Sequence, residues 1–213
     1  MEQKSIESRA FFIEKFIKNS GLPRRYTSNI PMKPATDNDL EMYKRLKEIE
    51  TNAADFVNSG RNLLITSNIV GNGKTTWATK ILNSYIYNYA CNYTYSDINY
   101  TPALFINFPE LLAQTKKAIS NENILERVQR IDECVYTAKL VVFDDIATKM
   151  ASEYDMELLY VYINYRTNNM LSSIFTTNIS ANMLESQIGA RVADRITGYS
   201  ECIEFNGPGR RSC

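Results

Sequence analysis

The segment that most restricts the possible folds is a glycine-containing loop between an apolar run and a helical stretch. The run NLLIT leads directly into SNIVGNGKTTW at 67–77. Gly73, Lys74 and Thr75 fit the spaced pattern G-x-x-x-x-G-K-[ST], which is typical of phosphate-binding loops. Asn68 stands where the pattern has its first glycine. Asparagine tolerates left-handed backbone geometry, so we expect Asn68 to replace that glycine in a tight turn.

A loop of this kind binds phosphate because backbone N–H groups converge on anionic oxygens at a helix N-terminus. We expect Lys74 to reach the terminal phosphates of a nucleotide and the Thr75 hydroxyl to bind Mg²⁺. Gly71 and Gly73 let the backbone come close to the ligand. The candidate nucleotide contacts in the loop are Asn68, Gly71, Asn72, Gly73, Lys74, Thr75 and Thr76.

Two later strand ends carry polar residues that fit the same site. LVVFDD is a nearly continuous apolar run, typical of a strand buried on both faces, and it ends in Asp144 and Asp145. We expect Asp144 to hold Mg²⁺ and Asp145 to polarise the attacking water. Many ATPases have the longer glutamate at the second position, so Asp145 predicts slow turnover. IFTTN ends in Asn178, which we expect near the γ-phosphate.

Arginines near the end of the chain are candidate phosphate contacts. Arg191 and Arg195 are four residues apart and share one face of a predicted helix. Carboxylates such as Asp194 could neutralise them, or they could meet the γ-phosphate within one chain or across a subunit boundary. Arg210 and Arg211 follow a predicted tight turn in GPGRR.

Strand and helix patterns alternate along the chain, which predicts an α/β fold with a parallel sheet. The linker at 22–34 contains three prolines and is predicted to be extended. Five strands are expected at 62–66, 103–108, 139–145, 172–178 and 202–206. Helices are expected at 5–21, 36–60, 75–90, 109–119, 121–135, 152–167 and 182–196.

Composition excludes several classes of function. The chain of 213 residues has no histidine, which excludes histidine-based acid–base catalysis and most zinc sites. Lys plus Arg equals Asp plus Glu at 24 each, so DNA binding would need a local patch or an assembly that pools patches. No apolar stretch approaches the ~18 residues of a membrane helix, and we expect a cytoplasmic protein.

The motifs in this order resemble the DnaC/DnaI family of bacterial helicase loaders, within the AAA+ ATPases. The relevant pieces are SGLPRRYTS, NLLITSNIVGNGKTTWA, ALFINFPELLAQTKKA, LVVFDDIA, IFTTNIS, IGARVADRI and FNGPGRR. The resemblance covers residues 20–213, and IstB transposition ATPases share nearly the same layout. It implies an αβα P-loop AAA+ core with a five-stranded parallel sheet that binds ATP and Mg²⁺.

The resemblance also implies roles for single residues. Asn178 takes a sensor-1 role, Arg195 acts as an arginine finger on a neighbouring subunit, and Arg210 or Arg211 takes a sensor-2 role. Arg191 matches a further family arginine. Proteins of this family assemble into spirals, contact single-stranded DNA and deliver a hexameric DnaB-type replicative helicase.

The resemblance and the helical pattern together divide the chain at 1–21, 22–60 and 61–213. The first part is a helical extension, the second a linker with a leading helix, and the third the ATPase domain. The extension either binds a partner or packs on the ATPase core, and its candidate partner anchors are Phe11, Phe12, Phe16 and Ile17.

The sequence therefore predicts an ATP-dependent helicase loader whose slow turnover is stimulated by DNA or a partner. Candidate DNA contacts are Lys116, Lys117 and Phe108, although the lysines equally fit a solvated helix face. Three alternatives stay open. They are an IstB-like transposition ATPase, a non-catalytic ATP-binding adaptor, and a small-molecule kinase, for which the chain lacks an obvious lid.

Overall fold

The computed structural model describes residues 2–28, 31–34, 36–93, 99–148 and 152–207, and the side chains from residue 9 onward. Within these ranges, no helix is both long enough and apolar enough to cross a membrane.

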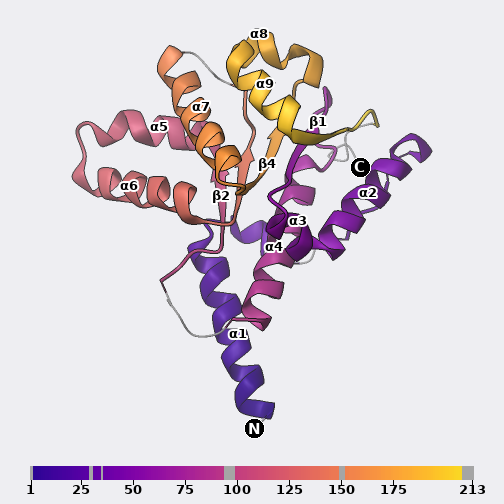
Figure 1. Cartoon of the computed structure of the whole chain (residues 1–213), viewed down its shortest axis with the longest axis vertical. Coiled ribbons are helices and arrows are strands. Elements are labelled where there is room, and N and C mark those ends of the chain that lie inside the picture. The colour runs from indigo at the N-terminus through magenta and orange to yellow at the C-terminus, as the bar shows by residue number, and fades with distance from the viewer. Residues whose placement is uncertain (1, 29–30, 35, 94–98, 149–151, 208–213) are drawn as a thin grey trace.

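A five-stranded, all-parallel sheet forms the centre of the molecule, in the order β2-β3-β4-β1-β5 (Figure 1). The strands are β1 (Asn62–Thr66), β2 (Ala103–Asn107), β3 (Leu140–Asp144), β4 (Ser172–Thr177) and β5 (Ser200–Glu204). Every residue of β1, β3 and β4 is buried, whereas the edge strand β5 is mostly half-buried or exposed. The nearly continuous apolar runs therefore lie in the middle of the sheet, as parallel strands covered on both faces require.

Helices cover both faces of the sheet, which gives an αβα sandwich (Figure 1). One face, with Leu63 and Val142, packs on the first set of helices. These are α1 (Glu2–Asn19), α2 (Leu40–Thr51), α3 (Ala53–Asn58) and α4 (Lys74–Cys91). The other face, with Val141 and Phe175, packs on the second set. These are α5 (Phe108–Ala118), α6 (Glu122–Thr137), α7 (Glu153–Asn168), α8 (Leu184–Ile188) and α9 (Ala190–Tyr199).

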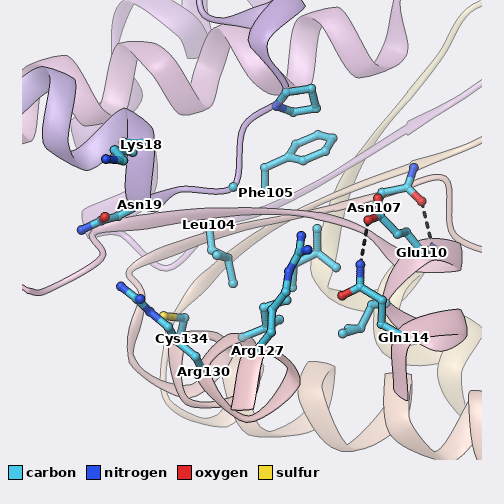
Figure 2. Close-up of a pocket in the computed structure, with 15 residues that line it drawn as sticks. Lys18, Asn19, Leu104, Phe105, Asn107, Glu110, Gln114, Arg127, Arg130 and Cys134 are labelled. Carbon is cyan, nitrogen blue, oxygen red and sulfur yellow. Dashed lines mark hydrogen bonds between the residues drawn. The ribbon is translucent and has the colours of Figure 1, made fainter. Parts of the chain in front are cut away.

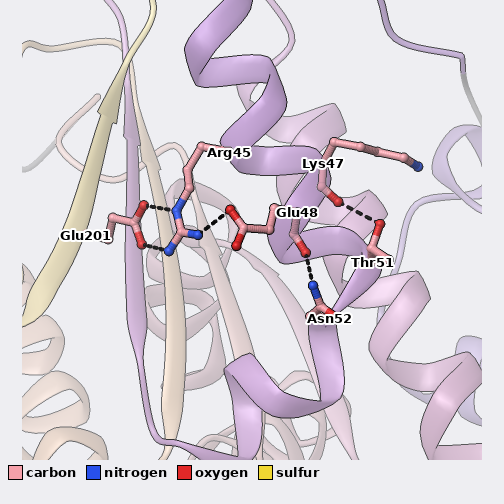
Figure 3. Close-up of polar contacts among 6 residues, drawn as sticks. All are labelled: Arg45, Lys47, Glu48, Thr51, Asn52 and Glu201. Carbon is pink, nitrogen blue, oxygen red and sulfur yellow. Dashed lines mark hydrogen bonds and ion pairs between the residues drawn. The ribbon is translucent and has the colours of Figure 1, made fainter.

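The predicted α/β architecture and all five strands are confirmed, but two predicted helices are interrupted. The helix expected at 36–60 begins with a 3₁₀ turn, η2 (Asp37–Asp39), and breaks at Asn52, where φ is −107° and ψ is 36°. The Asn52 side chain caps α2 by donating to the Glu48 carbonyl at 3.0 Å (Figure 3). The helix expected at 182–196 breaks at Gly189, whose φ of +79° favours glycine.

A bidentate salt bridge between Arg45 and Glu201 joins helix α2 to the edge strand β5 (Figure 3). Arg45 Nε donates to Glu201 Oε1 at 2.6 Å, and Arg45 Nη2 donates to Oε2 at 2.8 Å. Arg45 Nη1 also meets Glu48 at 2.6 Å. These hydrogen bonds lower the pKa of the Glu201 carboxyl, so the pair persists to acidic pH. The contact fixes α2 against the outer edge of the sheet.

Helix α1 packs on the far half of α4 through aromatic rings. Phe12 and Phe16 are buried, and both contact the ring of Tyr93, with centroids 4.8 and 5.3 Å away. Phe12 and Phe16 therefore belong to the core, and their proposed use as partner anchors is wrong. Ile17 is half-buried against the same cluster, and only Phe11, 54% exposed, presents a large ring to solvent.

Arg166 of α7 is completely buried and holds three elements together. Its guanidinium donates to the carbonyls of Val135 and Ala138 at the end of α6, at 2.6 and 2.9 Å. It also donates to Ser173 Oγ and the Ser172 carbonyl in β4, at 3.0 and 2.5 Å. Burial lowers the pKa of Arg166 to about 9, which leaves the side chain protonated at neutral pH. One buried cation thus satisfies backbone groups from α6 and β4.

Candidate nucleotide site

The residues predicted to bind nucleotide surround a cavity of about 580 Å³ at the carboxyl ends of the central strands. Ligands of open α/β sheets bind at this edge because the loops after parallel strands gather there. From the predicted set, the cavity is lined by Gly71, Asn72, Gly73, Lys74, Thr75, Thr76, Asp144, Asp145 and Asn178.

The loop after β1 has the left-handed geometry that its glycines permit. Gly71 and Gly73 have φ values of +86° and +100°. A Cβ at Gly73 would also meet the terminal methyl of Met32, which would have to move, so the positive φ is what favours glycine here. Asn68, by contrast, is not among the described residues with positive φ. The prediction that Asn68 adopts a left-handed backbone in place of a glycine is therefore wrong. Its side chain instead accepts a hydrogen bond from the Ser180 backbone N–H at 2.9 Å, which links the loop to the segment after β4.

Lys74 begins α4, and its amine lies inside the loop. Nζ donates to the Ile69 carbonyl and to Asn72 Oδ1, each at 3.2 Å. Asn72 is itself buried and donates to Ser67 Oγ. Ser67, which the sequence patterns did not single out, therefore anchors the residue that positions the lysine. The amine is held ready beside the backbone N–H groups that would receive a phosphate.

Thr75, Asp144 and Thr176 form a buried cluster where β3 and β4 end. Both threonine hydroxyls donate to Asp144 Oδ1, at 2.8 Å from Thr75 and 2.7 Å from Thr176. Burial raises the pKa of the Asp144 carboxyl, and the two hydrogen bonds only partly oppose this. A buried carboxylate beside a threonine hydroxyl, with its charge incompletely compensated, fits a divalent cation such as Mg²⁺.

Asp145 and Asn178 lie next to this cluster, joined by a hydrogen bond from Asn178 Nδ2 to Asp145 Oδ1 at 2.8 Å. Asp145 has a left-handed backbone, with φ +61°, an uncommon conformation for a residue other than glycine. Its N–H donates to Thr176 Oγ1 at 2.9 Å, and its Oδ1 also accepts from Thr148. Thr176 therefore fixes both acids at once. The TTN sequence contains Thr176, but only its hydrogen bond to Asp144 shows that its hydroxyl reaches the end of β3.

Because the Asp144 carboxylate is buried, we expect its charge to lower the free energy of unfolding at neutral pH. Its folded-state pKa lies above its unfolded value, so the folded state holds the proton more tightly and loses stability as pH rises through that window. Replacement by asparagine keeps an acceptor for both threonines and removes the charge. We expect Asp144→Asn to raise the free energy of unfolding at pH 7.5 by about 1 kcal/mol, or ~3 °C in Tm.

Thermal unfolding without nucleotide at pH 7.5 and pH 4.5 checks this prediction. The advantage of the variant should shrink at the lower pH, because the raised pKa lets wild-type Asp144 take up a proton more readily as pH falls. Exposed Asp194→Asn is the matched control and should leave Tm within about 1 °C at both pH values. A lower Tm for Asp144→Asn at pH 7.5 would show that the charge stabilises the empty site.

The linker before the core also lines the cavity, which the sequence patterns did not predict. The segment 22–34 was expected to be plainly extended, yet it contains a 3₁₀ turn, η1 (Arg24–Tyr26). The cavity is also lined by Arg25, Tyr26, Pro31 and Met32. The piece SGLPRRYTS, which contains Arg25 and Tyr26, belongs to the resemblance, but no local pattern places it at the phosphate loop, which it reaches by packing on α4.

Arg191 and Arg195 both lie on α9 and outside the set that lines this cavity. Among the described residues, neither forms an ion pair, so the proposed neutralisation by Asp194 is not observed. Each guanidinium lies over a tyrosine ring instead, Arg191 over Tyr160 at 4.4 Å and Arg195 over Tyr199 at 5.5 Å. A hydrogen bond from Arg191 lowers the pKa of the Tyr160 hydroxyl. Two cations are thus held at the surface, away from their own chain's phosphate loop.

The remaining candidates have different outcomes. Phe108 is buried, with its ring centroid 6.4 Å from that of Phe143, so its proposed DNA contact is wrong. Lys116 Nζ pairs with the buried Asp155 at 3.3 Å, while Lys117 is exposed. Arg210 and Arg211 lie outside the described residues.

A second cavity, of about 380 Å³, is lined by residues of β2, α5 and α6 and of the segment around the end of α1 (Figure 2). Asn107 lines both cavities, and its Oδ1 caps α5 by accepting from the Glu110 N–H at 3.0 Å. Lys18, Arg127 and Arg130 stand around an apolar floor in this second cavity. It contains none of the predicted site residues.

No protein-family model matches the sequence, and no curated protein matches it. Solved structures do match. A DnaC helicase loader is 20% identical with a TM-score of 0.62, over 86% of this chain and all of that one. DnaI is 18% identical with a TM-score of 0.65, over 86% of this chain and 94% of that one. The replication initiator DnaA, bound to AMPPCP and single-stranded DNA, is 14% identical with a TM-score of 0.63, over 86% of this chain and half of that one.

Because the sequence identities are 14–20%, these likenesses establish the fold alone. The likenesses extend over 86% of this chain, which includes most of its five-stranded parallel sheet and the helices that cover it. The predicted αβα fold with a five-stranded parallel sheet is thereby confirmed, and it is the fold of the DnaC helicase loader and of DnaI.

Proposed function

We propose that this chain is an ATP-dependent helicase loader that acts in the cytoplasm during DNA replication. It binds ATP and Mg²⁺, assembles with copies of itself on single-stranded DNA and delivers a hexameric DnaB-type helicase. The observation that carries the nucleotide part is the hydrogen-bonded chain Thr75–Asp144–Thr176–Asp145–Asn178 in the cavity that contains Lys74. The loader part is supported by the shared fold with DnaC and DnaI.

The chain's own residues would divide the work of hydrolysis. The N–H groups of the loop and Lys74 bind the phosphates, which requires Nζ to leave the Ile69 carbonyl. Thr75 and Asp144 would hold Mg²⁺, which supplies charge neutralisation at the β- and γ-phosphates. Asp145 orients the attacking water, and Asn178 keeps the Asp145 carboxylate in place through their 2.8 Å hydrogen bond.

Arg195 completes the site from a neighbouring subunit, with Arg191 beside it. Both side chains lie outside their own chain's cavity and lack carboxylate partners among the described residues. An arginine placed in this way can stabilise the charge that develops on the γ-phosphate only when a second subunit docks. ATP therefore favours assembly, and hydrolysis dissolves it.

Light scattering on a size-exclusion column tests this function. The protein is mixed with the replicative helicase of its own system, with and without Mg-ATP, and ATP turnover is measured with and without single-stranded DNA. We expect a defined complex in Mg-ATP, and none with Lys74→Ala. Separate elution under both conditions would contradict the loader function and favour a transposition ATPase. Binding of ATP without turnover, even with both partners, would favour an adaptor.

A further inference from the structure

The nucleotide cavity is lined by a second cation besides Lys74, and its positive charge suits an anionic ligand. Its charged lining consists of Arg25 and Lys74 against Asp144 and Asp145. A nucleoside triphosphate with one Mg²⁺ adds a net charge of about −2. Lys74 alone would leave the charged lining at a net charge of −1 against the phosphate chain, and Arg25 brings that net charge to zero.

The Arg25 side chain stacks on the ring of its neighbour, Tyr26. Its guanidinium lies 4.5 Å from the centroid of the Tyr26 ring. Tyr26 is buried, and its carbonyl accepts a hydrogen bond from Asn83 of α4 at 2.8 Å. Stacking on a ring covers one face of a guanidinium and leaves its N–H edge available for a planar anion. The side chain is therefore oriented before any ligand arrives.

The guanidinium also has no carboxylate partner among the described residues. Within the described part of the chain, Arg25 forms no ion pair, in contrast to Arg45 with Glu201. Arg25 lines the same cavity as the two acids and Asn178.

We infer that Arg25 is a phosphate ligand in cis, which rests on the proposed function of ATP binding. Its guanidinium binds the phosphate chain of the nucleotide held by Lys74 of the same chain, through hydrogen bonds that the rigid fork of arginine favours. A single subunit then closes the site from both sides before any neighbour supplies Arg195. The linker becomes a wall of the occupied site.

The chain offers a matched control one residue away. Arg24 is in the same 3₁₀ turn and is also exposed, but it does not line the cavity. Binding of ATP, ADP and AMP is measured by calorimetry in Mg²⁺, on the full chain diluted to a monomer. The proteins are wild type, Arg25→Ala, Arg25→Lys and Arg24→Ala, with Tm values to verify folding.

We expect Arg25→Ala to weaken ATP binding about tenfold, which corresponds to ~1.4 kcal/mol, while Arg24→Ala stays within twofold of wild type. The loss should be smaller for ADP and smallest for AMP, and Arg25→Lys should recover part of the ATP affinity. Equal ATP affinities for Arg25→Ala and Arg24→Ala would overturn the inference. So would an equal loss for all three nucleotides, because Arg25 would then contact the nucleoside. Failure of wild type to bind any nucleotide would reject the proposed function and this inference together.

Discussion

Replacing Arg195 with alanine is expected to lower ATP turnover of the assembled protein about a thousandfold, because an arginine supplied to the γ-phosphate stabilises the transition state by that order. ATP affinity of the isolated chain should not change, since Arg195 lies on α9 outside its own cavity. Turnover at saturating ATP, with single-stranded DNA present, measures the effect. Exposed Arg61→Ala is the control and should keep wild-type turnover.

Mixing two inactive variants separates action across a subunit boundary from action within one chain. Lys74→Ala lacks phosphate binding but retains Arg195, while Arg195→Ala retains the phosphate site. In a mixed assembly, some sites combine an intact loop with an intact arginine, so part of the turnover should return. If Arg195→Ala alone turns over ATP at the wild-type rate, the arginine-finger role is wrong. If it is inactive and mixing restores nothing, Arg195 acts within its own chain.

The second large effect concerns stability, and its cause is the buried guanidinium of Arg166. We expect Arg166→Met to lower the free energy of unfolding by about 3–5 kcal/mol, because methionine leaves the carbonyls of Val135, Ala138 and Ser172 without donors. In a chain of this size, that corresponds to a Tm lower by roughly 10 °C. Chemical and thermal unfolding without nucleotide measure it.

Two further variants separate the hydrogen bonds from the charge. Arg166→Lys keeps the charge but cannot reach acceptors on both α6 and β4, so it should lose about 2 kcal/mol or more. Exposed Arg127→Met on α6 should change the free energy of unfolding by less than about 0.5 kcal/mol. If Arg166→Met and Arg127→Met unfold at the same midpoint, the buried network contributes nothing to stability.

The sequence predicted those parts of the fold and the site that depend on local patterns. Apolar runs that end in polar residues predicted β1, β3 and β4, and parallel pairing explains why Thr75, Asp144 and Asn178 then meet at one edge. Glycines before Lys74 predicted the backbone geometry of the loop, apart from Asn68. These features need only residues close in sequence and the general rule for parallel sheets.

The errors have physical causes that local patterns do not contain. Phe108 follows the capping residue Asn107, so it occupies the first turn of α5 and points into the core beside Phe143. Apolar periodicity continues across Asn52 and Gly189, although the backbone breaks there. Arg25 reaches the site through tertiary packing of the linker, about 50 residues before the loop it faces.

Helix α4 has a mechanical consequence for the N-terminal helix. Its 18 residues run without interruption from Lys74 to Cys91, a rod about 27 Å long. Phosphate would be gripped at its first turn, and Phe16 of α1 packs on Tyr89 in its last turns. A tilt of α4 by about 5° about its first turn would displace its last turn by roughly 2 Å. Helix α1, which packs there, would then move with the nucleotide state. A fluorescent probe beside the exposed Phe11 should therefore respond to ATP, and a silent probe would show that the rod stays still.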